Sequence, residues 1–167
     1  MEQSKLDGLY LKTLEFFSCD PARIQHFAKV HSFAALIGRK EHLPKQEQFT
    51  LEAAAIVHDV GILPAEKKYG SSSGRLQELE GPPVATELLS SLDFPTEVTE
   101  RVAYLVGHHH TYTDIDGMDY QILVEADFLV NFFEGCTPKE QIEATGKRLF
   151  RTGAGKRILS KMFGVDC

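Results

Sequence analysis

The 167-residue sequence has little cysteine, no long apolar segment and no excess of positive charge. Its three cysteines, Cys19, Cys136 and Cys167, form no C-x-x-C pair, and their odd number favours a reducing compartment over a disulfide framework. No apolar run approaches the roughly 20 residues that a membrane helix requires. The polar start Met1–Lys5 also lacks the apolar core of a signal peptide. We therefore expect a cytoplasmic protein with no membrane partner.

The charge balance excludes a further class of partner. The formal net charge is -6 at pH 7, and the basic residues form only short clusters, at Lys67-Lys68, Lys147-Arg148 and Lys156-Arg157. A surface that is negative overall repels a phosphate backbone unless a strong basic stripe overrides it. We expect no polymeric nucleic acid as a partner.

The overall composition is that of an ordinary globular protein, with 43% hydrophobic and 25% charged residues. A chain of 167 residues is long enough for one well-buried core and too short for two. The sequence therefore predicts a single domain over residues 1–167. Within it we expect a motif-bearing core at about 20–134 and C-terminal helices at 137–163.

Apolar residues recur at helical spacing along most of the chain. Asp20-Pro21 is typical of a helix start, with an N-cap followed by proline at the first helical position, and Gly38 is typical of a helix end. Residues 61–74 are rich in Gly, Pro and Ser and predict a long loop. We expect an all-α fold, a single compact helical bundle, with helices at about 4–17, 20–38, 44–57, 83–92, 95–108, 119–133 and from 137 onward.

Histidines and aspartates collect where the predicted helices end or turn inward. His26 lies on the apolar stripe of its helix, and His58-Asp59 ends the apolar run 53–57. His108-His109-His110 ends another apolar helix, and Asp127 lies inside the almost wholly apolar segment 122–130. These positions predict that the side chains meet in the interior of the bundle.

Asp127 is the most informative of these residues. A carboxylate in an apolar helix is costly to bury unless a cation or hydrogen-bond donors compensate it. A divalent transition metal bound by carboxylates and imidazoles would do so, and this ligand set suits Fe, Mn, Co, Ni or Zn better than Ca or Mg. Such a metal would lower the pKa of water and neutralise charge on a phosphoryl group. The alternative is an ion pair with an arginine such as Arg101, with the histidines as hydrogen-bonded core residues.

The order of these residues resembles the HD-domain superfamily of metal-dependent phosphohydrolases, whose pattern is H…HD…D on a helical bundle. The segment 26–34 is similar to its H-x-x-x-V-x-x-x-A helix, 55–61 to its apolar-HD-apolar-G signature, and 124–127 to its apolar-x-A-D helix. The resemblance covers about residues 20–134. It implies a bundle of the HD type, Asp59 as the catalytic residue, and a metal held by His26, His58, Asp59 and Asp127.

Many members of that superfamily bind a second metal through additional histidines. The matching segment of this chain is Leu79-Glu80-Gly81-Pro82, in which glutamate replaces histidine, and His109-His110 best matches the later histidines. The resemblance therefore implies one or two ions. Glu80, His109 and His110 are the candidate ligands of the second ion, and His108 is expected to be a neighbour.

Two branches of the superfamily can be compared with the sequence. The HD-GYP branch of cyclic-dinucleotide phosphodiesterases usually has lysine after HD-x-G and a G-Y-P motif. This chain has Ile62 and Asp116-Gly117-Met118 at those places, which disfavours that branch. The diadenosine tetraphosphate hydrolase branch is more similar, since it shares Gly81-Pro82 and His110-Thr111, although it keeps the histidine that Glu80 replaces. The chain thus resembles small stand-alone HD hydrolases without an assigned substrate.

The resemblance implies a metal-dependent phosphohydrolase acting on a small phosphorylated molecule, with a nucleotide as the favoured substrate. Lys68, in the predicted loop, and Arg75, directly after it, are candidate substrate-binding residues. The alternative is a regulatory or ligand-binding module that keeps the HD fold without turnover, which Glu80 and Ile62 favour. The presence of all four core ligands favours the enzyme.

Overall fold

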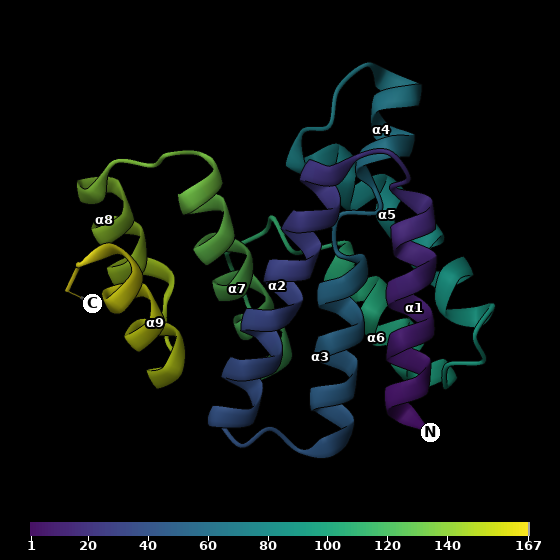
Figure 1. Cartoon of the computed structure of the whole chain (residues 1–167), viewed down its shortest axis with the longest axis horizontal. Coiled ribbons are helices and arrows are strands. Elements are labelled where there is room, and N and C mark those ends of the chain that lie inside the picture. Colours follow the sequence, from purple (N-terminus) through teal and green to yellow (C-terminus); the bar gives the residue numbers. More distant parts are fainter. Residues whose placement is uncertain (167) are drawn as a thin grey trace.

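The computed structural model describes residues 1–166 and is helical almost throughout (Figure 1). Within these residues there is no strand, which confirms the predicted all-α fold. The helices of this described range are α1 (Glu2–Phe16), α2 (Pro21–Lys40), α3 (Lys45–Val57), α4 (Ile62–Tyr69), α5 (Gly74–Ser90), α6 (Thr96–Val106), α7 (Met118–Glu134), α8 (Lys139–Leu149) and α9 (Gly153–Phe163).

Helix α2 begins as its sequence predicts but ends later. The Asp20 carboxylate accepts a hydrogen bond from the Arg23 backbone N–H at 3.1 Å, and Pro21 occupies the first turn. The helix continues past Gly38 to Lys40. Gly38 serves packing instead, because a Cβ there would lie 2.2 Å from the side chain of Gln48 on α3.

The predicted loop at 61–74 is wrong, because helix α4 fills most of it. Pro64 lies in the first turn of α4, where its missing N–H removes no helical hydrogen bond. Gly70 ends the helix in the left-handed region, with φ of 66°, and its N–H donates to the Glu66 carbonyl at 2.8 Å. Only a short connection at 70–73 separates α4 from α5.

Helix α5 begins at Gly74, well before the predicted start at Pro83, and runs through Pro82 and Pro83. Tertiary packing accounts for this extension. A Cβ at Gly61 would lie 2.3 Å from the Gln77 carbonyl oxygen and 2.9 Å from the Gly81 nitrogen. The glycine after the His58-Asp59 turn therefore lets the backbone of α5 pass directly against that turn.

Helices α2, α3 and α7 lie side by side at the centre of the molecule, with α8 and α9 at one flank (Figure 1). Ala53, Ala54 and Ala55 on α3 are fully buried, so their small side chains allow the neighbouring helices to approach. Residues 119–127 of α7 are all buried. A helix that is apolar on all sides belongs in a core, and its burial carries Asp127 inside.

The buried hydrophobic side chains form one cluster that runs from Leu6 on α1 to Val165 after α9. The single domain stays a prediction, which this continuous core supports. Cys19 and Cys136 are free, exposed thiols, and Cys167 lies outside the described residues. None of the helices in residues 1–166 combines the length and apolarity that crossing a membrane requires.

Glu125 is a fully buried carboxylate that joins α7 to the start of α9. It accepts hydrogen bonds from the Gln121 side chain at 2.7 Å and from the backbone N–H groups of Arg151 and Thr152 at 2.7 and 3.0 Å. The Thr152 hydroxyl donates to its second oxygen at 2.5 Å. These donors satisfy the carboxylate, so Glu125 has a structural role distinct from that of Asp127.

We expect Glu125→Gln to lower the free energy of unfolding by about 1–2 kcal/mol, because three donors lose a charged acceptor and the amide NH₂ cannot accept the hydrogen bond of the Thr152 hydroxyl. Urea unfolding followed by circular dichroism measures this change. Glu143→Gln removes the same charge from a half-buried position on α8, where the carboxylate pairs with the exposed Lys147 one turn later, and should leave the stability nearly unchanged. Equal stability of the two variants would contradict the structural role of Glu125.

Candidate metal centre

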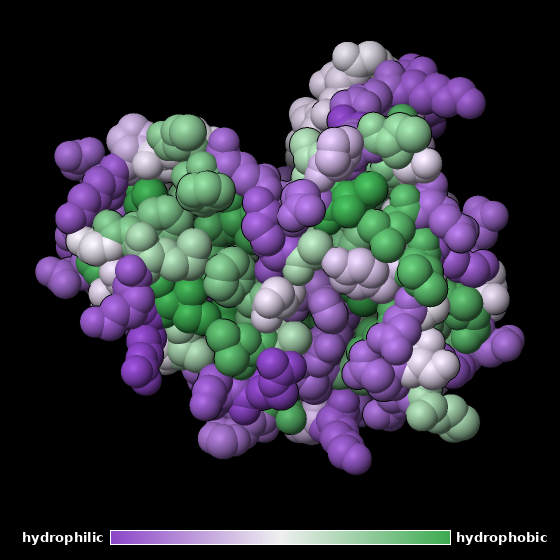
Figure 2. All heavy atoms as spheres, in the orientation of Figure 1, coloured by the Kyte–Doolittle hydropathy of each residue, from purple (hydrophilic) through white to green (hydrophobic). Residues whose placement is uncertain are grey.

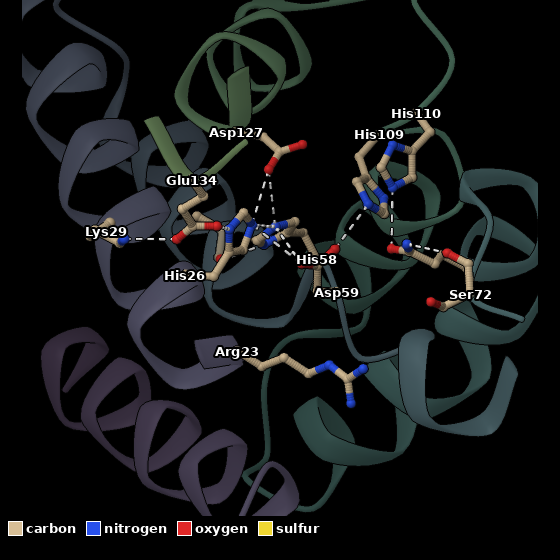
Figure 3. Close-up of polar contacts among 12 residues, drawn as sticks. Arg23, His26, Lys29, His58, Asp59, Ser72, His109, His110, Asp127 and Glu134 are labelled. Carbon is tan, nitrogen blue, oxygen red and sulfur yellow. Dashed lines mark hydrogen bonds and ion pairs between the residues drawn. The ribbon is translucent and has the colours of Figure 1, made fainter. Parts of the chain in front are cut away.

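Helices α2, α3 and α7 bring His26, His58 and Asp127 together around Asp59 (Figure 3). His26 Nε2 lies 3.2 Å from His58 Nε2 and 3.1 Å from Asp127 Oδ1. Asp59 Oδ2 lies 3.3 Å from His26 Nε2 and 3.4 Å from His58 Nε2. The four side chains predicted from the sequence therefore converge on one point, although they come from segments up to 101 residues apart.

The outer nitrogen of each imidazole is held by an oxygen. The Nδ1 atoms of His58 and His109 donate to the backbone carbonyl three residues earlier, at 2.9 and 2.8 Å. His26 Nδ1 donates to Glu134 Oε2 at 2.8 Å. Carbonyl and carboxylate oxygens only accept, so Nδ1 carries the hydrogen of each neutral ring and Nε2 turns its lone pair toward the carboxylates.

This arrangement fits a divalent transition metal. The facing lone pairs of His26 and His58 repel each other unless a proton or a cation lies between them. Among the described residues His109 Nε2 is buried without a hydrogen-bond partner, and a buried polar atom without a partner is costly. Divalent transition metals prefer imidazole nitrogens and carboxylate oxygens as ligands, and this site brings both together.

The charges of the first cluster support the same conclusion. Burial alone would lower the pKa of His26 and of His58, but the hydrogen bonds and charges of Asp59 and Asp127 outweigh it and raise both pKa values. Burial would raise the pKa of Asp59 and of Asp127, but the imidazoles hold both pKa values below their usual range. The carboxylates therefore remain ionised and attract positive charge to this point.

A second cluster lies on the other side of Asp59. His109 Nε2 is 3.4 Å from Asp59 Oδ1, and ligand atoms of Asp59, His109 and His110 all lie within 4.8 Å of one another. Burial, together with the charge of His109, lowers the pKa of His110 to about 4, so its ring is neutral near pH 7. Asp59 thus presents one oxygen to each cluster.

Glu80, which the resemblance implied as a ligand of the second ion, lies elsewhere. Its carboxylate accepts hydrogen bonds from Lys68 Nζ at 2.9 Å and from the Tyr69 hydroxyl at 2.8 Å. Gln77, one turn earlier on α5, is the side chain whose Oε1 lies 3.2 Å from His110 Nε2. The physical reason is the early start of α5 and its close passage by Gly61, which bring its first turn to the cluster.

Lys68 and Arg75, the predicted substrate-binding residues, also lie away from the imidazoles. Lys68 is largely exposed and forms an ion pair with Glu80 at 2.9 Å. Arg75 lines a separate surface hollow together with Tyr69 and Leu79. Both predictions assumed a loop, whereas the helical geometry of α4 and α5 directs these side chains elsewhere.

A pocket of about 270 Å³ opens onto the clusters and is lined by His26, Asp59, Asp127 and His110, among others. A cation in this lining is Arg23, one turn before His26 on α2. Its guanidinium pairs with Glu66 at 2.6 Å and with Asp20 at 3.1 Å. Figure 3 shows Arg23 below Asp59, away from Asp127.

The remaining candidate residues have structural partners. His108 Nδ1 donates to the Tyr104 carbonyl at 2.7 Å, as expected of a neighbour of the cluster. Arg101 pairs with Asp119 at 2.7 Å and with Asp116 at 3.2 Å. Arg101 is therefore engaged elsewhere, and the alternative in which it neutralises Asp127 is wrong.

A larger groove, of about 730 Å³, lies between α2 and α9. Leu36, Ala154, Ile158 and Met162 contribute to its lining, and hydrophobic side chains gather on this flank of the molecule (Figure 2). The described residues that line it include no histidine and no aspartate. The smaller pocket, which holds the ionisable groups, is therefore the candidate site despite its size.

Several residues that line the pocket, or that contact its lining as Lys29 does, are absent from the predicted set. Arg23 and Lys29 lie one turn before and one turn after His26, and Glu134 lies two turns after Asp127. Helical spacing from the predicted ligands would have found these three. Gln77 has no such signal, because its position depends on the path of α5.

Comparisons with known proteins agree with this geometry. The HD domain family model matches residues 23–145, a segment that includes all four residues of the first cluster. A crystal structure described as a "predicted HD superfamily hydrolase" from an uncultured Thermotogales bacterium has a TM-score of 0.66 to this chain, at 21% identity. The match covers 97% of this chain and 84% of that chain, and at this identity it shows the fold alone. No match was found among curated proteins.

We expect Co²⁺ to stabilise the wild-type protein against urea, by about 2.7 kcal/mol when the free ion is at 100 times its dissociation constant. Asp127→Asn should abolish this effect, because it removes the ionised carboxylate of the first cluster. His31→Gln is the control, since His31 lies on α2 with His26 but contacts Glu52 at 3.1 Å instead of the cluster. If Co²⁺ does not stabilise the wild-type protein against urea, the proposed metal centre is contradicted.

Proposed function

Because the chain belongs to the HD domain family, we propose that it is a metal-dependent phosphohydrolase acting on a small phosphorylated molecule, with a nucleotide as the favoured substrate. The observation that carries the proposal is the position of Asp59. Its Oδ2 faces His26 and His58, and its Oδ1 faces His109. A carboxylate between two imidazole clusters suits two ions that share a ligand, and the first cluster by itself can hold a single ion.

In this proposal His26, His58, Asp59 and Asp127 hold the first ion. Asp59, His109 and His110 are the side chains available to a second. The bound metal supplies positive charge that stabilises phosphoryl oxygens and makes water more acidic. The protein contributes the placement of these groups and their burial, since His58 and His109 are fully buried and bulk water is kept from their side of the site.

Arg23 is proposed to bind the phosphate. Its guanidinium presents a planar set of donors that matches two phosphate oxygens. Glu66 and Asp20 now hold it beside the pocket, so an anionic substrate would replace those carboxylates as the partner. A pocket of about 270 Å³ is slightly smaller than the roughly 300–1,000 Å³ of sites that enclose a drug-sized ligand. It therefore suits the phosphate end of a nucleotide, with the remainder outside.

We expect the protein loaded with Mn²⁺, Fe²⁺ or Co²⁺ to release phosphate from nucleoside 5′-monophosphates or from p-nitrophenyl phosphate. Asp59→Asn should reduce kcat by about 10³-fold or more, because it removes the charge shared by both clusters. Phosphate release measures both rates, and His42→Gln, at an exposed position, is the control. Metal-loaded protein without turnover on any phosphoester would favour the alternative, a ligand-binding module of the same fold.

We expect Arg23→Met to raise KM for the phosphate monoester by about 10-fold or more while the metal content stays unchanged, because it removes a charged hydrogen-bond donor to the phosphate. Steady-state kinetics combined with elemental analysis measures the two quantities. Arg75→Met removes the same charge from the separate hollow and should leave KM unchanged. An unchanged KM in Arg23→Met would contradict the phosphate-binding role.

A further inference from the structure

The imidazoles of the two clusters are not all held in the same way. His58 and His109 donate from Nδ1 to backbone carbonyls of their own helices. These partners belong to the local fold and change little with side-chain substitution. His26 instead donates to the Glu134 side chain, which lies 108 residues later in the sequence. On its Nδ1 side, His26 is therefore oriented by a single side-chain carboxylate.

Both oxygens of that carboxylate are engaged by α2. Glu134 Oε2 accepts from His26 Nδ1 at 2.8 Å, and Glu134 Oε1 accepts from Lys29 Nζ at 2.7 Å. Lys29 lies one turn after His26 on α2, so the two donors are neighbours on one helix face. Figure 3 shows Glu134 between Lys29 and His26. Because each oxygen of Glu134 has a different partner, the carboxylate is held in one orientation.

The position of Glu134 is unfavourable in itself. It is the last residue of α7, where the partial negative charge of the helix end disfavours a carboxylate. Lys29 compensates this charge through the ion pair. Glu134 also lies seven residues after Asp127, two turns along the same face. Helix α7 thus supplies one predicted metal ligand and the partner of another.

We propose that Glu134, held in place by Lys29, is a positioning residue that sets the tautomer and orientation of His26 and thereby the strength of metal binding at the first cluster. The inference rests on the metal centre of the proposed function. A carboxylate acceptor keeps the hydrogen on Nδ1, which leaves Nε2 free to bind a metal and makes it a stronger donor to the ion. Glu134 itself lies on the Nδ1 side of the ring, away from Asp59 and Asp127.

The test is the affinity of the 167-residue protein for Co²⁺, measured by competition with a chromophoric chelator, together with the visible absorption of the bound Co²⁺. Glu134→Ala should weaken binding by about 10–100-fold and alter the spectrum, because His26 loses its partner. Glu134→Gln keeps an acceptor oxygen without the charge and should weaken binding less. Lys29→Met should give an intermediate or small loss, and Glu143→Gln, on α8, should bind like wild type.

A purely structural role for Glu134 makes a different prediction, and urea unfolding of the metal-free proteins detects it. Positioning requires that metal-free Glu134→Gln be about as stable as wild type while its Co²⁺ affinity falls. Wild-type affinity and spectrum in both Glu134 variants would overturn the inference, and so would a loss of metal-free stability with unchanged affinity. If Glu134→Ala fails to fold, Glu134→Gln decides.

The outcomes also separate this inference from the proposed function. Wild-type protein that binds Co²⁺ but hydrolyses no phosphoester would contradict the proposed function and leave the Glu134 affinities as a valid test. Wild-type protein with turnover, beside Glu134 variants that bind Co²⁺ normally, would contradict the positioning role alone. Wild-type protein that takes up no Co²⁺ would overturn both.

Discussion

The burial of Asp127 in the most apolar helix of the molecule is the constraint on which the rest of the structure depends. A carboxylate that is 4% exposed inside α7 cannot remain ionised without compensation. The compensation comes from imidazoles on α2 and α3, so those helices must approach α7 closely at one point. The buried alanines of α3 allow this approach, and the turn after His58 places Asp59 beside the same imidazoles. The close approach of α2 and α3 to α7 therefore both packs the core and assembles the site. The side chains that meet there are also of the types that bind metals.

The arrangement of partners around the imidazoles divides the site into a rigid part and an adjustable part. His58 and His109 are oriented by carbonyls of their own helix ends, which move only if the helices do. His26 depends on Glu134 and Lys29 at the pocket side, where the Glu134 side chain is 32% exposed. The exposed side of the site is thus the side at which substitutions can change metal affinity without disturbing the core.

Electrostatics explain why such a site needs a cation before it can bind phosphate. The protein carries a net charge of -6, and the pocket lining includes Asp59, Asp127 and Glu134. These carboxylates repel a phosphate, and the charge of Arg23 is already balanced by Glu66 and Asp20. A divalent ion at the imidazoles would reverse the sign of the local field. The proposed binding of a small phosphorylated molecule therefore depends on that ion.

The helical fold and the first cluster could be predicted from the sequence alone. Apolar periodicity marks most helices, and the order of His26, His58-Asp59 and Asp127 along them carries the resemblance to the H…HD…D pattern. The rest of the pocket depends on tertiary packing. Helix α4 was missed because glycine and proline at its ends are typical of a loop, and α5 was predicted to start too late because Pro82 and Pro83 suggest a start. The position of Gln77 beside His110 in place of Glu80, and the absence of Lys68 and Arg75 from the pocket lining, follow from these helix boundaries and from the close passage of α5 by Gly61. Such contacts join residues far apart in the chain, so local pattern carries no information about which turn of a helix reaches the site.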